Sequence, residues 1–277
     1  MNPERIYQQH REDALARQIA AERYSTFVAM PFRDTFSFRS TEVHKEIIQK
    51  AAETANVRGI AKRKFASPRR VDEAAGQAIV ITEEIVVGIL ESHFFLADIT
   101  FQNAGVILET GIALGLKPNQ QIILISQGTP AEIHFDLRNN NIIFYKDTTA
   151  VEKLADAMIA AAKAFESDVD RYVDSITKSL SPPAIFCLRW YAEATYKVPA
   201  QSLHDGIANS VFPNRQRGEP ELLFHLATSE LIKSKILSTG YHPRAAGTND
   251  VYGMNTTELG RAVTHKLWPE YSKPLTA

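Results

Sequence analysis

The 277-residue sequence contains a single cysteine, Cys187, and no long apolar run. One cysteine cannot form a disulfide within the chain or a multi-cysteine zinc site, so we expect a reducing, cytoplasmic location and no bound metal. The first 20 residues carry charges throughout and lack the apolar stretch of a secretory signal. The most apolar segments, 79–90 and 106–116, are shorter than a membrane span and contain glutamates. We therefore expect neither export nor membrane insertion.

The chain also has almost no net charge, with 31 basic residues against 32 acidic ones and a formal charge of −1. This balance argues against a protein whose main role is to coat nucleic acid. Hydrophobic residues make up 44% of the chain, and the glycine and proline contents are ordinary for a globular protein. Length and composition together predict one large or two modest domains with a packed core.

Short apolar runs alternate with segments of helical periodicity along most of the chain. A polar helix is expected within the N-terminal segment 1–23. The predicted strands are 24–30, 57–60, 93–99, 121–126 and 141–145, and the predicted helices that follow them are 40–56, 78–92, 103–116 and 148–165. Nearly continuous apolar strands separated by helices predict an α/β domain with a parallel sheet covered on both faces. We expect this domain to span residues 24–178.

A second, smaller domain is expected over 184–277, because Ser181-Pro182-Pro183 interrupts the helical pattern. Its predicted elements are a helix at 219–236, a turn at Gly240, a polar loop at 242–250, a strand at 251–254 and a helix that ends at Leu267, capped by Asn255 or Thr256. This order, and the phrase from Tyr252 to Arg261, resembles a winged helix. Residues 215–270 contain seven basic and six acidic side chains, which does not favour DNA binding. A protein partner or self-association is at least as well supported.

Ligands of such parallel sheets bind beyond the carboxyl ends of the strands, and the segment after strand 93–99 is the most informative one there. Glu109 is the only ionisable side chain between Ile99 and Leu116. Its neighbours one helical turn away are small or apolar: Gly105, Val106, Ile112 and Ala113. A carboxylate without a local partner is exposed, matched by a distant group, or kept in a cleft where desolvation tunes it for catalysis.

Two further features lie at the predicted ligand edge. Asp98 closes its strand and Asn103 precedes the next helix, where each serves as a cap, as a ligand group, or as both. Between Val57 and Val71 there is no acid and there are six basic residues: Arg58, Lys62, Arg63, Lys64, Arg69 and Arg70. Because this run follows the strand predicted at 57–60, we expect its side chains either to remain solvated or to hold phosphates.

Several phrases, in order along residues 24–165, resemble the nucleoside 2-deoxyribosyltransferase-like and TIR-like nucleotide-binding domains. They are Phe27-Val-Ala-Met-Pro-Phe32, Ala97-Asp-Ile-Thr-x-x-Asn103 and Glu109-Thr-Gly-Ile-Ala-Leu-Gly115, and the segment FDLR at 135–138 is similar to a later TIR-like element. The resemblance implies a flavodoxin-like fold. Two patterns differ: Asn103-Ala-Gly-Val106 replaces the Asn-x-Asn-Val of many relatives, and the Asp-x-Gly-Thr of dedicated deoxyribosyltransferases is absent.

The resemblance implies cleavage or exchange of an N-glycosidic bond, that of NAD in the TIR-like branch, where NAD is substrate rather than cofactor. It makes Glu109 the catalytic carboxylate, which stabilises or captures the developing oxocarbenium ion. The implied substrate-binding residues are Met30, Pro31, Phe32, Asp98, Thr100 and Asn103. Separately, the charge and position of the basic run make Arg63, Lys64, Arg69 and Arg70 the candidate phosphate-binding residues.

By the same resemblance the protein would be a toxic effector of bacterial defence, switched on when a sensor or an assembly orders the site. Two alternatives stay open. One is a non-catalytic nucleotide sensor whose C-terminal module binds DNA or a protein partner. The other is a nucleoside deoxyribosyltransferase, which exchanges bases between deoxynucleosides.

Overall fold

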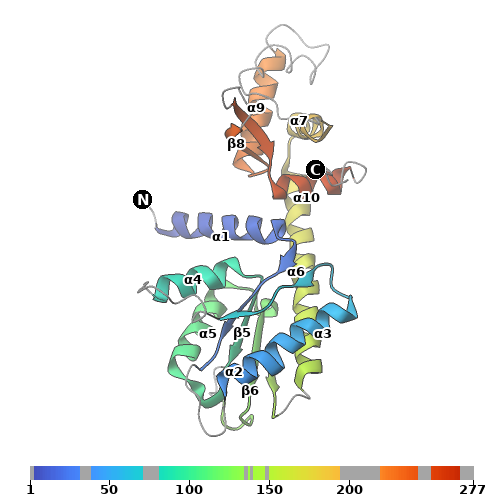
Figure 1. Cartoon of the computed structure of the whole chain (residues 1–277). Coiled ribbons are helices and arrows are strands. Elements are labelled where there is room, and N and C mark those ends of the chain that lie inside the picture. Colours follow the sequence, from blue (N-terminus) through green and yellow to red (C-terminus); the bar gives the residue numbers. More distant parts are fainter. Residues whose placement is uncertain are drawn as a thin grey trace. The chain divides into compact units, whose positions relative to one another are not determined.

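A computed structural model of the chain describes residues 3–31, 39–70, 81–133, 137, 140–146, 150–193, 219–242 and 251–268. The chain divides into two compact units, Met1–Asp168 and Val169–Ala277, and Figure 1 labels their helices and some of their strands. The division falls inside one long helix, α6 (Ala150–Ser179), whereas the sequence led us to expect a boundary near residue 180. In the described part of the chain, no helix is both long and apolar enough to cross a membrane.

The first unit contains a five-stranded sheet in which every neighbouring pair of strands is parallel. Across the sheet the strands are β4 (Arg69–Arg70), β2 (Thr26–Ala29), β5 (Phe94–Asp98), β6 (Ile122–Ser126) and β7 (Ile142–Phe144). Numbered along the chain, this order is second, first, third, fourth and fifth, which is compatible with a flavodoxin-like core. The predicted α/β class with a parallel sheet is confirmed.

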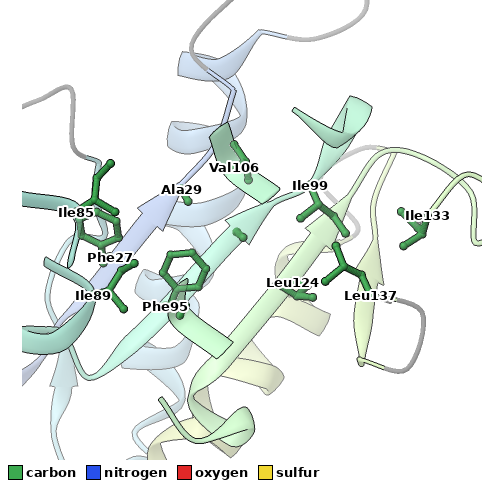
Figure 2. Packing of buried hydrophobic residues seen from close by; sticks show 12 residues of the cluster. Phe27, Ala29, Ile85, Ile89, Phe95, Ile99, Val106, Leu124, Ile133 and Leu137 are labelled. Carbon is green, nitrogen blue, oxygen red and sulfur yellow. The ribbon is translucent and has the colours of Figure 1, made fainter. Parts of the chain in front are cut away.

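Helices cover both faces of this sheet (Figure 1). One face carries α4 (Ile81–Glu91) and α5 (Ala104–Leu116), and the other carries the first part of α6 and a helical segment made of α2 (Ser40–Val43), a π-helical stretch (His44–Gln49) and α3 (Lys50–Arg58). Alternate strand residues such as Phe27, Phe95 and Leu124 pack against Ile89 and Val106 of the helices on the first face (Figure 2). The core therefore holds α5 against the centre of the sheet.

The strand predicted at 57–60 is wrong. Helix α3 continues through Arg58 and ends at Gly59, whose left-handed φ of 62° suits glycine. Val57 is 87% exposed and Ile60 56% exposed, so neither is part of a buried strand. The strand that pairs with β2 is instead β4, which is formed by the last two residues of the basic run.

Two other features of the first unit differ from the prediction: a second, smaller sheet and the length of one helix. A separate two-stranded sheet forms where β1 (Arg23–Tyr24) pairs in parallel with β3 (Lys64–Phe65). The predicted helix 148–165 is longer, because buried Val169 and Val173 continue its apolar repeat. The N-terminal polar helix is present as α1 (Pro3–Ala20).

The second unit contains helices and one antiparallel hairpin. Its elements are α7 (Pro182–Glu193), α9 (Glu219–Lys233), β8 (Leu237–His242), β9 (Val251–Thr256) and α10 (Glu258–Leu267). The turn predicted at Gly240 is wrong, since Gly240 lies within β8 opposite Gly253. The cap of α10 is neither Asn255 nor Thr256 but Thr257, whose hydroxyl accepts from the Gly260 amide at 3.0 Å. Most of the predicted polar loop, residues 243–250, lies outside the described residues.

Candidate functional site

The connection from β5 to α5 brings several of the predicted site residues to the carboxyl edge of the sheet. It consists of Ile99, a short 3-10 turn (Thr100–Gln102) and Asn103. The exposed Asn103 caps α5, because its Oδ1 accepts from the amides of Gly105 at 3.0 Å and Val106 at 3.3 Å. The oxygen of the Asn103 side-chain amide is therefore used to cap the helix.

Asp98 and Thr100, two of the expected substrate-binding residues, are 0% and 1% exposed. The Asp98 carboxylate accepts from the Thr100 amide at 3.0 Å and from the Thr100 hydroxyl, and its other oxygen accepts from the Tyr145 hydroxyl. Burial raises the pKa of Asp98, while these hydrogen bonds act in the opposite direction. In this conformation Asp98 joins the β5–α5 turn to the end of β7 and does not face solvent.

Further hydrogen bonds tie the same turn to the segment after β6. The Thr100 hydroxyl accepts from the Gln127 amide at 2.9 Å. The Gln102 side-chain amide donates to the Glu132 carbonyl oxygen at 2.5 Å. Tyr145, Gln127 and Gln102 were not predicted as site residues from the sequence. Tyr145 alone has a sequence signal, because its hydroxyl group is a polar group at the end of the apolar run 141–145. Together these contacts fix the loop geometry at the carboxyl edge.

Glu109 is the acidic residue of helix α5. It lies in the second turn of α5, is partly buried, and makes no hydrogen bond or ion pair with any residue that the structure describes. Burial raises the pKa of Glu109 to about 7. The carboxyl group is therefore close to half ionised at neutral pH, which suits a nucleophile, a charge stabiliser or a proton-transfer group.

The two described residues directly after β2, Met30 and Pro31, contribute little surface to the site. Met30 is 2% exposed and Pro31 is also buried. Both residues are part of the packed interior in this conformation. Phe32, the third expected substrate-binding residue of this segment, lies outside the described residues.

The basic run does not form one group at the ligand edge as expected. Lys64 is in β3, which pairs with β1 ahead of β2, so Arg63 and Lys64 lie at the amino edge of the fold. Arg69 and Arg70 form the edge strand β4, the first exposed and the second 6% exposed. The physical reason is that α3 extends through Arg58, so that Arg63 and Lys64 precede the strand β4, while Arg69 and Arg70 form it.

At that amino edge, the Arg63 side chain is held by contacts with other residues of the fold. Its guanidinium donates to the carbonyl oxygens of Gln18 and Ala21, both at 2.8 Å, and pairs with Glu166 at 3.2 Å. The guanidinium carbon also lies 5.6 Å from the centre of the Tyr24 ring. These contacts use the donors that a phosphate would need.

No protein-family model and no curated protein matches the sequence. Over the described residues, there is no group of three or more His, Cys, Asp or Glu side chains placed to hold a metal ion. A functional proposal therefore rests on the chemistry of the described residues near this edge, in particular on Glu109, which has no polar partner among them.

Proposed function

We propose that the protein cleaves the N-glycosidic bond of a nucleotide, with NAD as the substrate and Glu109 as the catalytic carboxylate. One observation carries the proposal. Glu109 is partly buried, has no partner among the described residues and has a pKa raised to about 7, on the helix that follows a central strand of a parallel sheet. Groups perturbed in this way are concentrated at functional sites.

The chemistry follows from the position of the carboxylate. As the bond between ribose C1′ and the base nitrogen breaks, its electron pair leaves with the base and positive charge develops on the sugar. In NAD the pyridinium nitrogen takes this pair, so nicotinamide departs as a neutral molecule. The ionised Glu109 stabilises the cation or bonds to C1′, and water then completes hydrolysis.

Neighbouring residues would position the sugar. The Asn103 oxygen caps α5, which leaves its amide nitrogen to donate to a ribose hydroxyl. Asp98 and Thr100 act indirectly in this account, because they are buried and shape the turn that presents Asn103. The strand order supports the flavodoxin-like, TIR-like or deoxyribosyltransferase-like assignment.

The C-terminal part is proposed to be a winged-helix-like module that binds a protein partner or a second copy of the chain. The hairpin of β8 and β9 between α9 and α10 supports this assignment. Phe186, Leu222 and Leu226 are about 60% exposed (60%, 59% and 58%), which suits an apolar contact better than a phosphate backbone. Such a module would couple assembly to activation in a cytoplasmic defence effector.

A second candidate is a non-catalytic nucleotide sensor. It is favoured by the complete burial of Asp98, since a carboxylate that binds ribose hydroxyls needs access to them. In that case Glu109 would contribute to nucleotide affinity and not to turnover.

The test compares wild type, Glu109→Gln and a control, Glu46→Gln, in which an exposed carboxylate paired with Lys50 is changed instead. Each protein is incubated with NAD, ATP and a panel of deoxynucleosides, and released base is measured by chromatography. We expect nicotinamide from wild type and from Glu46→Gln but none from Glu109→Gln. Undiminished release by Glu109→Gln contradicts the proposal, base exchange between deoxynucleosides identifies a transferase, and NAD binding without turnover identifies a sensor.

A further inference from the structure

Tyr145 is a buried residue of the carboxyl edge to which the proposed reaction assigns no role. It directly follows β7, is 2% exposed, and its amide donates to the carbonyl oxygen of Ser126, the last residue of β6, at 2.9 Å. Its hydroxyl group donates to the carboxylate of Asp98, the last residue of β5, which lies 47 residues earlier in the chain. Tyr145 therefore joins the ends of three neighbouring strands.

The Asp98 carboxylate is held in a way that stability alone does not favour. It is 0% exposed and accepts from neutral groups, which are the Tyr145 hydroxyl and the hydroxyl and amide of Thr100. Burial raises the pKa of Asp98, and among the described residues no cation offsets this shift. Apolar residues of similar volume often replace buried charged groups without loss of stability. The carboxylate is better explained by the geometry that its hydrogen bonds impose.

That geometry is the conformation of the β5–α5 turn. Phe101 has a φ of 59° and Gln102 a φ of 49°, both in the left-handed region that residues other than glycine, asparagine and aspartate seldom adopt. Such a conformation persists only where surrounding contacts hold it. The contacts begin at Thr100, which donates twice to Asp98 and whose hydroxyl accepts from the Gln127 amide at 2.9 Å.

The position of this turn matters for the proposed reaction. The turn leads directly into Asn103, which caps α5 and which the proposal places against a ribose hydroxyl, and α5 carries Glu109. A displacement of about 1 Å at a reacting centre can lower a rate about 100-fold. Without the Tyr145 hydroxyl, one buried oxygen of Asp98 loses this donor, and the turn loses its link to β7.

We infer that Tyr145 is a positioning residue for the proposed glycosidase reaction, and that it holds the turn that presents Asn103 through Asp98 and Thr100. The inference rests on the proposed function. It adds to that function a residue from a different strand, which acts through the Asp98 carboxylate and not by contact with the substrate.

The experiment compares full-length wild type, Tyr145→Phe and a matched control, Tyr24→Phe. Tyr24 is 0% exposed, and its hydroxyl also donates to a carboxylate, that of Glu166 at 3.0 Å, but at the amino edge. Each variant loses one hydrogen bond between a buried tyrosine and a carboxylate. A purely structural role of Tyr145 therefore predicts similar falls in melting temperature and no difference in turnover between the two variants.

We expect kcat/KM for nicotinamide release from NAD to fall at least about tenfold in Tyr145→Phe and to stay within about twofold in Tyr24→Phe. Hydrogen exchange of the Thr100 amide should be faster in Tyr145→Phe alone, because this amide donates to Asp98. Thr100→Val removes the hydroxyl that donates to Asp98 and should lower kcat/KM in the same way. Thr100→Ser keeps this hydroxyl and should lower kcat/KM less.

Equal values of kcat/KM in Tyr145→Phe and Tyr24→Phe would overturn the inference, as would a fall in Tyr145→Phe without faster exchange at Thr100. If Tyr145→Phe does not fold, the comparison of Thr100→Val with Thr100→Ser decides, and equal rates in these two variants overturn the inference. Failure of the proposed function gives a different pattern, because wild type and Tyr24→Phe then release no nicotinamide.

Discussion

The two edges of the parallel sheet differ in whether their buried polar side chains have hydrogen-bond partners. At the amino edge, His93 accepts from the Ser25 amide at 3.0 Å and donates to the Gln18 carbonyl at 2.9 Å, and Lys117 donates to the Ser92 carbonyl at 2.5 Å. At the carboxyl edge, the partly buried Glu109 has no partner among the described residues. The first arrangement stabilises the fold, whereas under our proposal the second leaves Glu109 available to a ligand.

Burial shifts pKa values at both edges, so the shift alone does not identify a site. Desolvation lowers the pKa of His93 to about 4 and that of Lys117 to about 7, and it raises the pKa of Glu109 to about 7. The difference lies in the partners and in the backbone. Among the described residues, the carboxyl edge alone combines an acid that has no partner among them with an exposed aromatic residue at a positive φ. Departures from local preferences are expected where function demands them.

The largest expected effect on stability is at the amino edge. Arg63→Met removes a guanidinium that is 14% exposed and leaves Glu166, 12% exposed, without that partner. Breaking one side of such a pair costs about 3 kcal/mol. Arg69→Met, at an exposed arginine of the neighbouring strand, is the control and should cost less than about 0.5 kcal/mol. Urea unfolding measures both, and equal effects would remove the contrast between the two arginines.

The next largest effect is a dependence of the free energy of unfolding on pH, which we attribute to His93. Its pKa is about 4 in the folded state, against 6.5 for the free side chain. As pH falls, the unfolded chain therefore binds this proton before the folded chain does. The contribution of His93 to the free energy of unfolding is fully present above pH 6.5 and is lost as pH falls toward 4. This linkage predicts a loss of about 2 kcal/mol between pH 7 and pH 5. His93→Gln should flatten this part of the profile in urea unfolding, and a profile as steep as that of wild type would contradict the assignment.

A smaller effect of opposite sign is expected at Glu109. Because its pKa is raised from 4.5 to about 7, folding favours the protonated form; this contribution is present below pH 4.5 and is lost as pH rises through 7. Glu109→Gln should therefore be more stable than wild type by about 1 kcal/mol at pH 8, after allowance for solvent screening, and no more stable at pH 4. Glu46→Gln should show no such gain. A loss of stability at pH 8 would mean that Glu109 has a structural role.

Much of the fold could be predicted from the sequence, and the errors have physical causes. β5, β6 and α5 end within about two residues of their predicted limits, because continuous apolar runs and an asparagine cap are local signals. β4 consists of two arginines and has no apolar signature, so the strand was assigned to the end of α3 instead. That single error also moved Arg63 and Lys64 to the wrong edge.

The candidate site was predictable in part. The isolation of Glu109 is visible in the sequence because its helical neighbours are all uncharged. The burial of Asp98 is not, because it depends on Tyr145, which is 47 residues further along the chain. The left-handed turn at Phe101 carries no local signal either, since phenylalanine is a residue that such a turn disfavours.

The most direct test of the account is the pH dependence of kcat/KM for nicotinamide release from NAD. If ionised Glu109 stabilises the developing cation, kcat/KM should rise with pH through an inflection near 7, the pKa that burial gives this carboxyl group. A profile that is flat from about pH 5.5 to 8.5, or that falls across this range, would contradict the role of Glu109 as the catalytic carboxylate.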